Sequence, residues 1–275
     1  MRRVLVGLGI LLTGGCAFLP QVGKIPVLHN PFPEMNRVAV APFFNLSEEP
    51  TVDGRQFALA YYNALQNVPG FEVIPVGQVE RAMRDHRIGL NSPEEARRLA
   101  QLVGADAIVI GAVTDYSPYY PPRCGLRVEW YAAKPGVQPP LAGKEQTVSL
   151  EKVSTPGEPN SVFAHQQSKA AVGPPEKSSL EEKSRQNGEN ELANPPILPV
   201  ATHTRIYNGH DAEFTSALSQ YLLTRDDARF GGWQTYLERS DDFIRFCCYK
   251  HLEEMLVEQG GAVQTKLVWR WSAIR

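Results

Sequence analysis

Alternation between strand-like and helix-like segments constrains this chain more than any other feature. Arg37–Pro42, Phe71–Pro75 and Ala107–Val113 are short runs rich in Val, Ile and Ala, which is typical of buried strands. Two stretches between them, 53–68 and 92–104, carry apolar residues at helical spacing. Strands that alternate with helices predict an α/β layer with parallel neighbouring strands and right-handed crossovers.

The two predicted helices have clear start signals. Asp53 is a suitable N-cap, and Gln56, three residues later, can close a capping box. Ser92 precedes Pro93, and Glu95 stands where it can return the hydrogen bond. We therefore expect helices that begin directly after Asp53 and after Ser92.

The segment 132–201 differs from the rest of the chain. It contains ten prolines and one aromatic residue, Phe163, among many Lys, Glu, Ser and Gln residues. Such a composition buries too little apolar surface to offset the entropy of ordering, which predicts a disordered insertion. It is either a partner-binding arm or a tolerated surface insertion.

Ordered patterns flank the insertion on both sides. Arg127–Tyr131 alternates like an edge strand, and His203–Tyr207 reads as another strand, so the insertion connects two strands of one sheet. Ser240 is expected to cap a long helix, and Lys266–Trp271 is either a last strand or a docked segment.

Together these patterns predict one α/β domain, with α+β as the alternative. Its sheet has about 4–6 mixed strands flanked by helices in three layers. Residues 36–131 form the N-terminal part, and residues 202–275 complete the same domain after the insertion.

The N-terminus predicts export. Arg2 and Arg3 precede an apolar run of nine residues, Val4–Leu12, which fits a signal peptide and is too short for a membrane span. Thr13-Gly14-Gly15 and Cys16 follow directly, so the segment resembles a bacterial lipoprotein signal. That resemblance implies cleavage after residue 15 and lipidation, palmitate included, of Cys16. The alternative is an ordinary secretory signal that leaves Cys16 free.

The residues after Cys16 suggest where the chain is anchored. Ala17, rather than Asp, follows the cysteine, which resembles sorting to the outer membrane, facing the periplasm, with the cell membrane as second choice. Residues 16–35 contain four prolines, which disfavour a helix and predict a semi-extended tether.

The chain has three further cysteines, whose redox state depends on the compartment. Cys124 can form a disulfide with Cys247 or Cys248 if the chain is exported. The alternative is that all three are small buried thiols, with Cys247 and Cys248 on different faces of one helix.

A family resemblance covers 37–115 and, weakly, the strand at His203–Tyr207. The segments RVAVAPFFNLSEEP, FEVIP and GADAIVIGAV, with the capped helices, resemble the curli-secretion (CsgG-like) channel family. They are also similar to the LpoB-like lipoprotein activators of cell-wall synthesis and to the TolB-like N-terminal domain of the Tol system. The shared features are hydrophobic patterns, so the resemblance implies a fold more than a function.

The sequence lacks recognisable catalytic or cofactor motifs. It has no Gly-rich loop after the first strand, no GxSxG and no HExxH. His203, His210 and Asp211 are candidates for a metal site and Asp226-Asp227 for a calcium site, but neither group has the usual ligand pattern. We therefore expect no enzyme, no cofactor and no metal.

Charge argues against nucleic-acid binding. Cleavage of the predicted signal peptide removes Arg2 and Arg3, so 26 of the 28 Lys and Arg residues remain against 30 Asp and Glu, a net charge of −4. A protein that binds nucleic acid usually has a basic patch or a basic overall balance.

Glu253 and Glu254 are expected on the solvated face of the last helix rather than as a catalytic pair.

These observations favour a non-enzymatic periplasmic lipoprotein that binds a protein partner in cell-envelope assembly, as an adaptor or activator. Its membrane contact is the lipidated Cys16, and the sequence leaves its oligomeric state open. One alternative is a subunit of a curli-type secretion channel, although no alternating strand of about 9–11 residues was found for a barrel. A second is an unrecognised hydrolase or nucleotide binder, since one fold hosts many functions.

Overall fold

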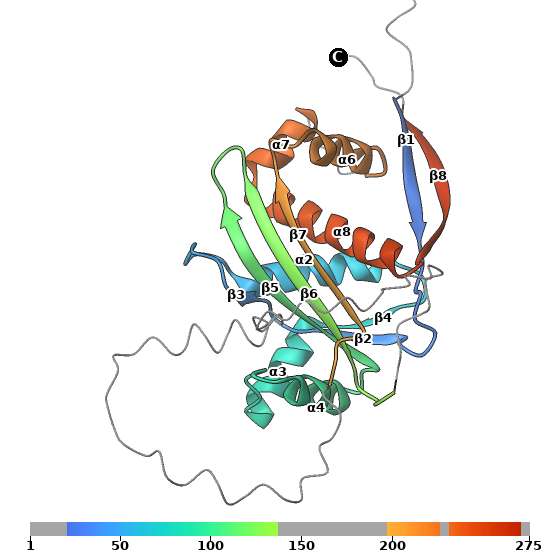
Figure 1. Ribbon diagram of the computed structural model, residues 1–275. Helices are drawn as coiled ribbons and strands as arrows, with labels where there is room; N and C mark the ends of the chain where they lie inside the picture. Colours follow the sequence, from blue (N-terminus) through green and yellow to red (C-terminus); the bar gives the residue numbers. More distant parts are fainter. Residues whose placement is uncertain (1–20, 137–196, 226–230, 271–275) are drawn as a thin grey trace, which may run out of the picture.

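A computed structural model describes residues 21–136, 197–225 and 231–270 (Figure 1). The predicted signal with Cys16, most of the insertion, Asp226-Asp227 and Trp271 lie outside the described residues. The elements in chain order are β1 Gln21–Leu28, β2 Arg37–Val40, β3 Phe44–Asn45, α2 Gly54–Gln66, β4 Glu72–Ile74, α3 Val76–His86, α4 Pro93–Val103, β5 Ala107–Ser117, β6 Arg123–Ala132, β7 Ala201–Asn208, α6 Ala212–Leu223, α7 Gly232–Glu238, α8 Ser240–Glu258 and β8 Ala262–Arg270.

A six-stranded mixed sheet organises the domain, as the sequence predicts. Its order is β4-β2-β5-β6-β7, and β3 adds to β5. β2 is parallel to β4 and β5, whereas β6 is antiparallel to both β5 and β7. The predicted parallel neighbours in the N-terminal part are therefore confirmed.

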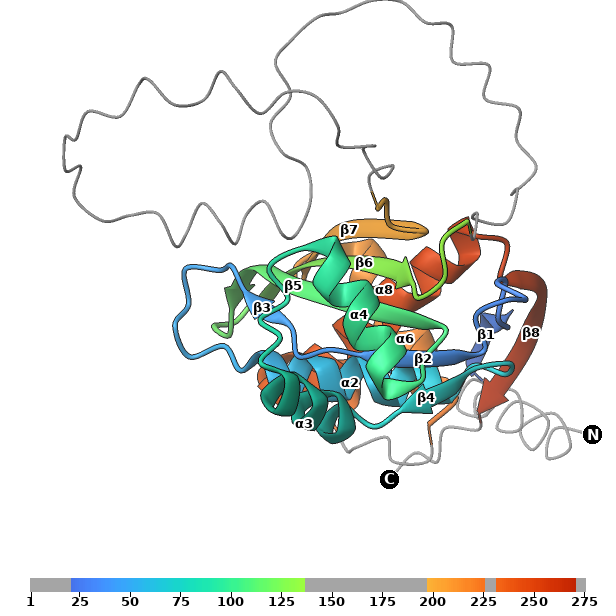
Figure 2. The same ribbon diagram turned by 90° about the horizontal axis from the view of Figure 1, so that it is seen from below.

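Helices cover both faces of this sheet, which gives three layers. Val38, Val109 and Trp130 belong to a core that includes α2 and α8 side chains. Ile108 and Tyr131, on the opposite face, belong to a second core with α3 and α4. Figure 2 shows α4 in front of the sheet and α8 behind it. None of the helices in the described part of the chain combines the length and apolarity that a membrane crossing needs.

The predicted helix starts are confirmed, with one difference in bonding. Ser92 Oγ accepts the N–H of Glu95 at 3.3 Å, and Asp53 accepts the N–H of Arg55 at 2.9 Å. Gln56, however, does not close a capping box: its Nε2 donates to Asp241 Oδ1 at 2.6 Å and so links α2 to α8.

The start of α8 corrects a second cap prediction. Ser240 is the first residue of the helix rather than its cap, and the N-cap position, Arg239, makes no side-chain cap bond. Asp241 and Asp242 lie in the first turn, where negative charge suits the helix dipole.

The strands on either side of the insertion are longer than predicted. β6 is an interior strand rather than an edge, because β7 pairs with it from Arg123 to Trp130. The described residues at both ends of the predicted insertion belong to the sheet: Ala132 ends β6, Ala201 begins β7, and the N–H of Val200 donates to Trp130 O at 2.7 Å. The prediction that the insertion connects two strands of one sheet is therefore confirmed, and the two strands are in addition adjacent.

The predicted tether is wrong for the described residues from Gln21 onward. β1 pairs antiparallel with β8 in a separate two-stranded ribbon, from Gln21 opposite Arg270 to Leu28 opposite Ala262. Phe32 and Met35, which follow β1, are buried in the core. Proline excludes helix but tolerates an edge strand, so a partner from the far end of the chain converts this proline-containing segment into β-structure.

Two glycines provide a matched test of this packing. A methyl group at Gly111, on β5, would collide with the ring of Phe43, whereas one at Gly77, on α3, would contact nothing within 4 Å. We expect Gly111→Ala to lower the free energy of unfolding by about 1–3 kcal/mol because the core is overpacked. Gly77→Ala should raise it by at most about 0.5–1 kcal/mol, since alanine loses less backbone entropy than glycine in the first turn of α3. Urea denaturation measures the free energy of unfolding of both variants. Equal changes in the two would contradict the packing of Phe43 against Gly111.

Candidate interaction surface

The C-terminal part of the domain places helices α6 and α8 side by side between β1 and β7. Asp211 begins α6 by accepting the N–H of Glu213 at 3.0 Å. α6 buries Phe214 and Leu218, and α8 buries Ile244 and Leu252 in the same core. The solvent side of this helix pair is concave.

A groove runs along α6 and α8. It consists of a hollow of about 280 Å³ next to β1 and a smaller one of about 40 Å³ next to β7. Glu213, Ala217 and Lys250 line both hollows, so the two are neighbours. We call this surface, between Ile25 of β1 and Tyr207 of β7, the α6–α8 groove.

Aromatic side chains form the floor of the α6–α8 groove. The ring centroids of Tyr221 and Tyr249 lie 4.6 Å apart, and those of Tyr221 and Phe246 lie 5.1 Å apart. Phe214 packs against Phe246 at 5.0 Å and continues the cluster toward β7. Such contacts favour a rigid apolar base.

Charged side chains form the rim. Lys250 Nζ lies 2.7 Å from Glu253 Oε1 and 3.7 Å from Glu254 Oε1. Burial, and then the charge of Glu253, raises the pKa of Tyr249, which keeps its hydroxyl protonated. An apolar centre with a charged rim is the composition of a protein-binding surface.

A polar cluster joins β7 to α8 at one end of the groove. His203 Nδ1 lies 3.0 Å from Glu258 Oε2, and His203 Nε2 lies 3.4 Å from Glu254 Oε2. Tyr207 OH donates to Glu254 Oε2 at 2.9 Å, and Arg205 Nε lies 3.9 Å from the same oxygen. The prediction that Glu254 lies on a solvated face is therefore wrong, because β7 packs beside this part of α8.

The two carboxylates control the charge of His203. Burial alone would lower its pKa, but hydrogen bonds and charge from Glu254 and Glu258 outweigh burial, so the pKa of His203 is raised. Burial likewise opposes ionisation of Glu254, yet the bonds from His203 and Tyr207 lower the pKa of that carboxyl. The cluster therefore favours a charged His203 between two carboxylates.

A second histidine in contact with the first is held neutral. His251 is fully buried, and its ring centroid lies 4.7 Å from that of His203. Its Nε2 lies 3.2 Å from the carbonyl oxygen of His203, which can only accept, so Nε2 carries the hydrogen. Burial first, and then the neighbouring His203, lowers the pKa of His251 to about 3.

The three candidate metal ligands, His203, His210 and Asp211, do not lie together. His203 bonds to Glu254 and Glu258, whereas Asp211 caps α6 and His210 is exposed. Among residues 21–136, 197–225 and 231–270, no group of three or more His, Cys, Asp or Glu side chains is arranged to hold a metal ion.

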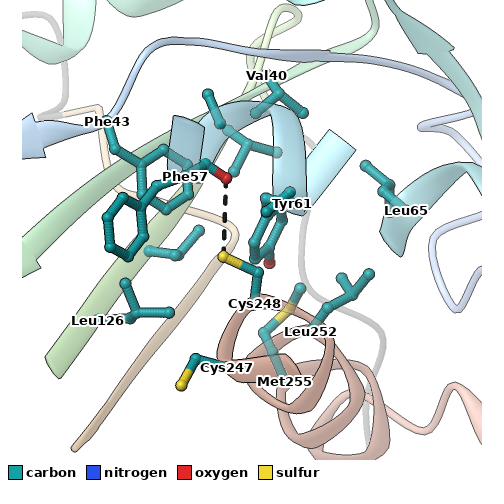
Figure 3. Close-up of a cluster of buried hydrophobic side chains, with 14 of the residues drawn as sticks. Val40, Phe43, Phe57, Tyr61, Leu65, Leu126, Cys247, Cys248, Leu252 and Met255 are labelled. Atoms are coloured by element: carbon teal, nitrogen blue, oxygen red, sulfur yellow. Dashed lines mark hydrogen bonds between the residues drawn. The ribbon is translucent and has the colours of Figure 1, made fainter. Parts of the chain in front are cut away.

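The three described cysteines are buried free thiols. As predicted, Cys247 and Cys248 point to different faces of α8 (Figure 3). Cys248 Sγ donates to Phe57 O of α2 at 3.7 Å, whereas Cys247 contacts Cys124 of β6. Burial, and then the hydrogen bond to Cys124, raises the pKa of Cys247. Of the two predicted bridges, only Cys124 with Cys247 joins side chains that the structure brings together, and that bridge stays a prediction.

Comparisons with known proteins give distant structural likenesses. No protein-family model and no curated protein sequence matches the chain. The lipoprotein GNA1162 of Neisseria meningitidis is 20% identical over 37% of this chain and 74% of its own, with a TM-score of 0.30. The C-terminal domain of LpoB from Salmonella enterica is 17% identical over 37% and 76%, with a TM-score of 0.31.

A third likeness is to the PelC dodecamer of Paraburkholderia phytofirmans. It is 18% identical over 41% of this chain and 71% of that chain, with a TM-score of 0.25. Scores this low do not establish a shared fold. The resemblances to the curli-channel and Tol families are not tested by these matches and stay predictions.

Sequence reasoning missed the partners of His203. Glu254 and Glu258 are one helical turn apart and share a face of α8, which the spacing of the two residues indicates. The strand that packs against this face, β7, follows the insertion. No local pattern specifies which strand a helix covers.

The raised pKa of His203 predicts a pH-dependent contribution to stability. A group whose pKa is higher in the folded than in the unfolded state stabilises the folded state. This stabilisation is fully present below the unfolded pKa, near 6.5, and is lost as the pH rises through the folded pKa. We expect His203→Gln to lower the free energy of unfolding by about 1–2 kcal/mol at pH 6 and by less at pH 9. Urea denaturation at both values measures this.

His210→Gln is the matched control, because this histidine is exposed. Its effect on the free energy of unfolding should be smaller than that of His203→Gln at pH 6. A His203→Gln cost that grows with pH would contradict a charged His203 in the folded state.

Proposed function

We propose that this chain is a lipid-anchored cell-envelope protein that binds a protein partner in the α6–α8 groove and catalyses no reaction. The observation that carries the proposal is the groove itself, with its floor of Tyr221, Phe246 and Tyr249 and its charged rim. Tyrosine and phenylalanine supply contact area at low entropic cost, and the rim charges orient a partner.

The floor is preorganised for binding. Tyr221 and Tyr249 are held by each other and by Phe246, so their rings lose little freedom when a partner covers them. Ser216 and Ala217, from α6, are small and line the hollow above this floor. A helix or extended segment with apolar anchors and charges complementary to the rim fits such a surface.

The predicted lipidation of Cys16 supplies the location. A single acyl chain binds a bilayer marginally, whereas the multiply acylated cysteine implied by the lipoprotein signal anchors stably. Such a protein acts in envelope assembly as an adaptor or activator at the membrane. We place it at the periplasmic face of the outer membrane, because Ala17 follows Cys16.

The anchor is tested by changing the lipidated residue. We expect Cys16→Ala to abolish incorporation of labelled palmitate and to remove the chain from the detergent-soluble membrane fraction. Ala17→Asp should keep the label but move the protein to the cell membrane fraction. Palmitate incorporation that persists in Cys16→Ala would contradict the lipid attachment.

The groove is tested with two exposed serines on the same helix. Ser216 lines the groove and Ser219 does not, so an arginine at either position changes charge and size equally. With a photo-crosslinking residue at Gln220, we expect Ser216→Arg to reduce partner crosslinks at least about tenfold, a loss of about 1.4 kcal/mol. Ser219→Arg should leave them unchanged.

Thermal unfolding of both variants controls for folding. Crosslinks that survive Ser216→Arg, in a protein with unaltered unfolding, would exclude the groove as the partner site. Loss of crosslinks in both variants would place the contact on another face of α6.

A further inference from the structure

The β1–β8 ribbon has one face that packs on the domain and one that does not. Residues directly opposite each other in an antiparallel pair share a face. Gly23 pairs with Val268, and a methyl group at Gly23 would lie 2.9 Å from Leu223 Cδ1 of α6, so this face contacts the helix. Val22 and Trp269, the neighbouring pair, therefore point outward.

The outward face is apolar and exposed. Val22 is 62% exposed, and its partner Trp269 is 65% exposed. Leu267, opposite Lys24, is 56% exposed, and Val263, further along β8, is also exposed. Four large apolar side chains on one strand pair form a patch of a kind that marks an interaction site for a protein or a membrane.

The position of the patch relative to the predicted anchor indicates what covers it. Only residues 17–20 separate Cys16 from Gln21, the first residue of β1. Five extended steps span at most about 18 Å. The Gln21 end of the ribbon, where Val22 and Trp269 lie, therefore cannot move farther than this from an acylated Cys16.

The chemistry of the patch suits a bilayer surface. Tryptophan favours the membrane–water interface, where its ring lies among headgroups and acyl chains. An apolar surface held this close to a membrane gains most by burial in it, because the anchor has already removed most of the entropic cost of association.

We propose that the outward face of the β1–β8 ribbon docks on the bilayer that holds Cys16, with Trp269 in the interface. This rests on the lipid anchor of the proposed function and adds a second membrane contact. It fixes the orientation of the domain, which the lipid anchor alone would leave free. A second copy of the chain covering the same face is the main competing occupant.

Quenching by brominated lipid tests the docking in the full, lipidated protein. The protein is incorporated into vesicles of phosphatidylethanolamine and phosphatidylglycerol, with or without bromine on the acyl chains. Subtracting the emission of Trp269→Phe isolates Trp269. We expect brominated lipid to reduce this difference emission at least about twofold. Trp233→Phe, on α7, gives the matched control signal, which should be unaffected.

A second pair of variants separates docking from folding. Val22→Ser with Leu267→Ser should protect Trp269 from brominated lipid and expose it to aqueous iodide. Ile206→Ser, at an exposed position on β7, should change neither.

Vesicle flotation distinguishes failure of the anchor from failure of docking. A protein that floats while Trp269 stays unquenched overturns docking and leaves the anchor intact. If Trp269 is shielded from both lipid and iodide, a second copy or another protein covers the ribbon, which also overturns docking. A protein that neither floats nor shows quenching overturns both proposals.

Discussion

Pairing of β6 with β7 is the interaction on which the rest of the domain depends. It joins residues 123–132 to residues 201–208 and so attaches the C-terminal helices to the N-terminal α/β unit. The inward side chains of both strands, such as Cys124 and Tyr207, form the surface on which α8 packs. Closing a long connection costs entropy that rises only slowly with its length, so a chain of this size tolerates it.

The N-terminal half of the fold follows closely from the sequence. Val, Ile and Ala in Ala107–Val113 and the Ser92-Pro93 start signal predict a strand and a helix that the structure contains. These signals are local, since they depend on residues within one turn or one strand. The pairing of β1 with β8 was not predicted, because β1 contains Pro26 and gains its partner from the far end of the chain. The alternating segment Lys266–Trp271 is predicted as either a last strand or a docked segment, and β8 confirms the strand up to Arg270.

The candidate surface was harder to predict for the same reason. The groove depends on the angle at which α6 and α8 pack, and the apolar spacing within either helix does not specify that angle. The pairing of His203 with Glu254 and Glu258 depends in addition on which strand lies at the edge of the sheet. The α6–α8 groove draws side chains from four separate segments, β1, β7, α6 and α8, and periodicity within any one segment cannot specify such a meeting.

The two histidines of this region oppose each other in pH dependence. His203 favours its charged form, whereas His251 favours its neutral form and destabilises the folded state as pH falls below its unfolded pKa toward about 3. Because the rings are in contact, a charge on His203 makes protonation of His251 less favourable still. The junction therefore accommodates one positive charge, on His203 beside Glu254 and Glu258. A second positive charge, on His251, is unfavourable there.

The ribbon and the groove are linked through β1. Lys24, Ile25 and Pro26 line the larger hollow of the groove, and the opposite end of the same strand begins five residues after Cys16. A lipid anchor at Cys16 would therefore hold the groove close to the membrane rather than extend it across the periplasm. A partner that binds there would meet this protein at the bilayer surface, so its own binding segment would have to lie near that membrane.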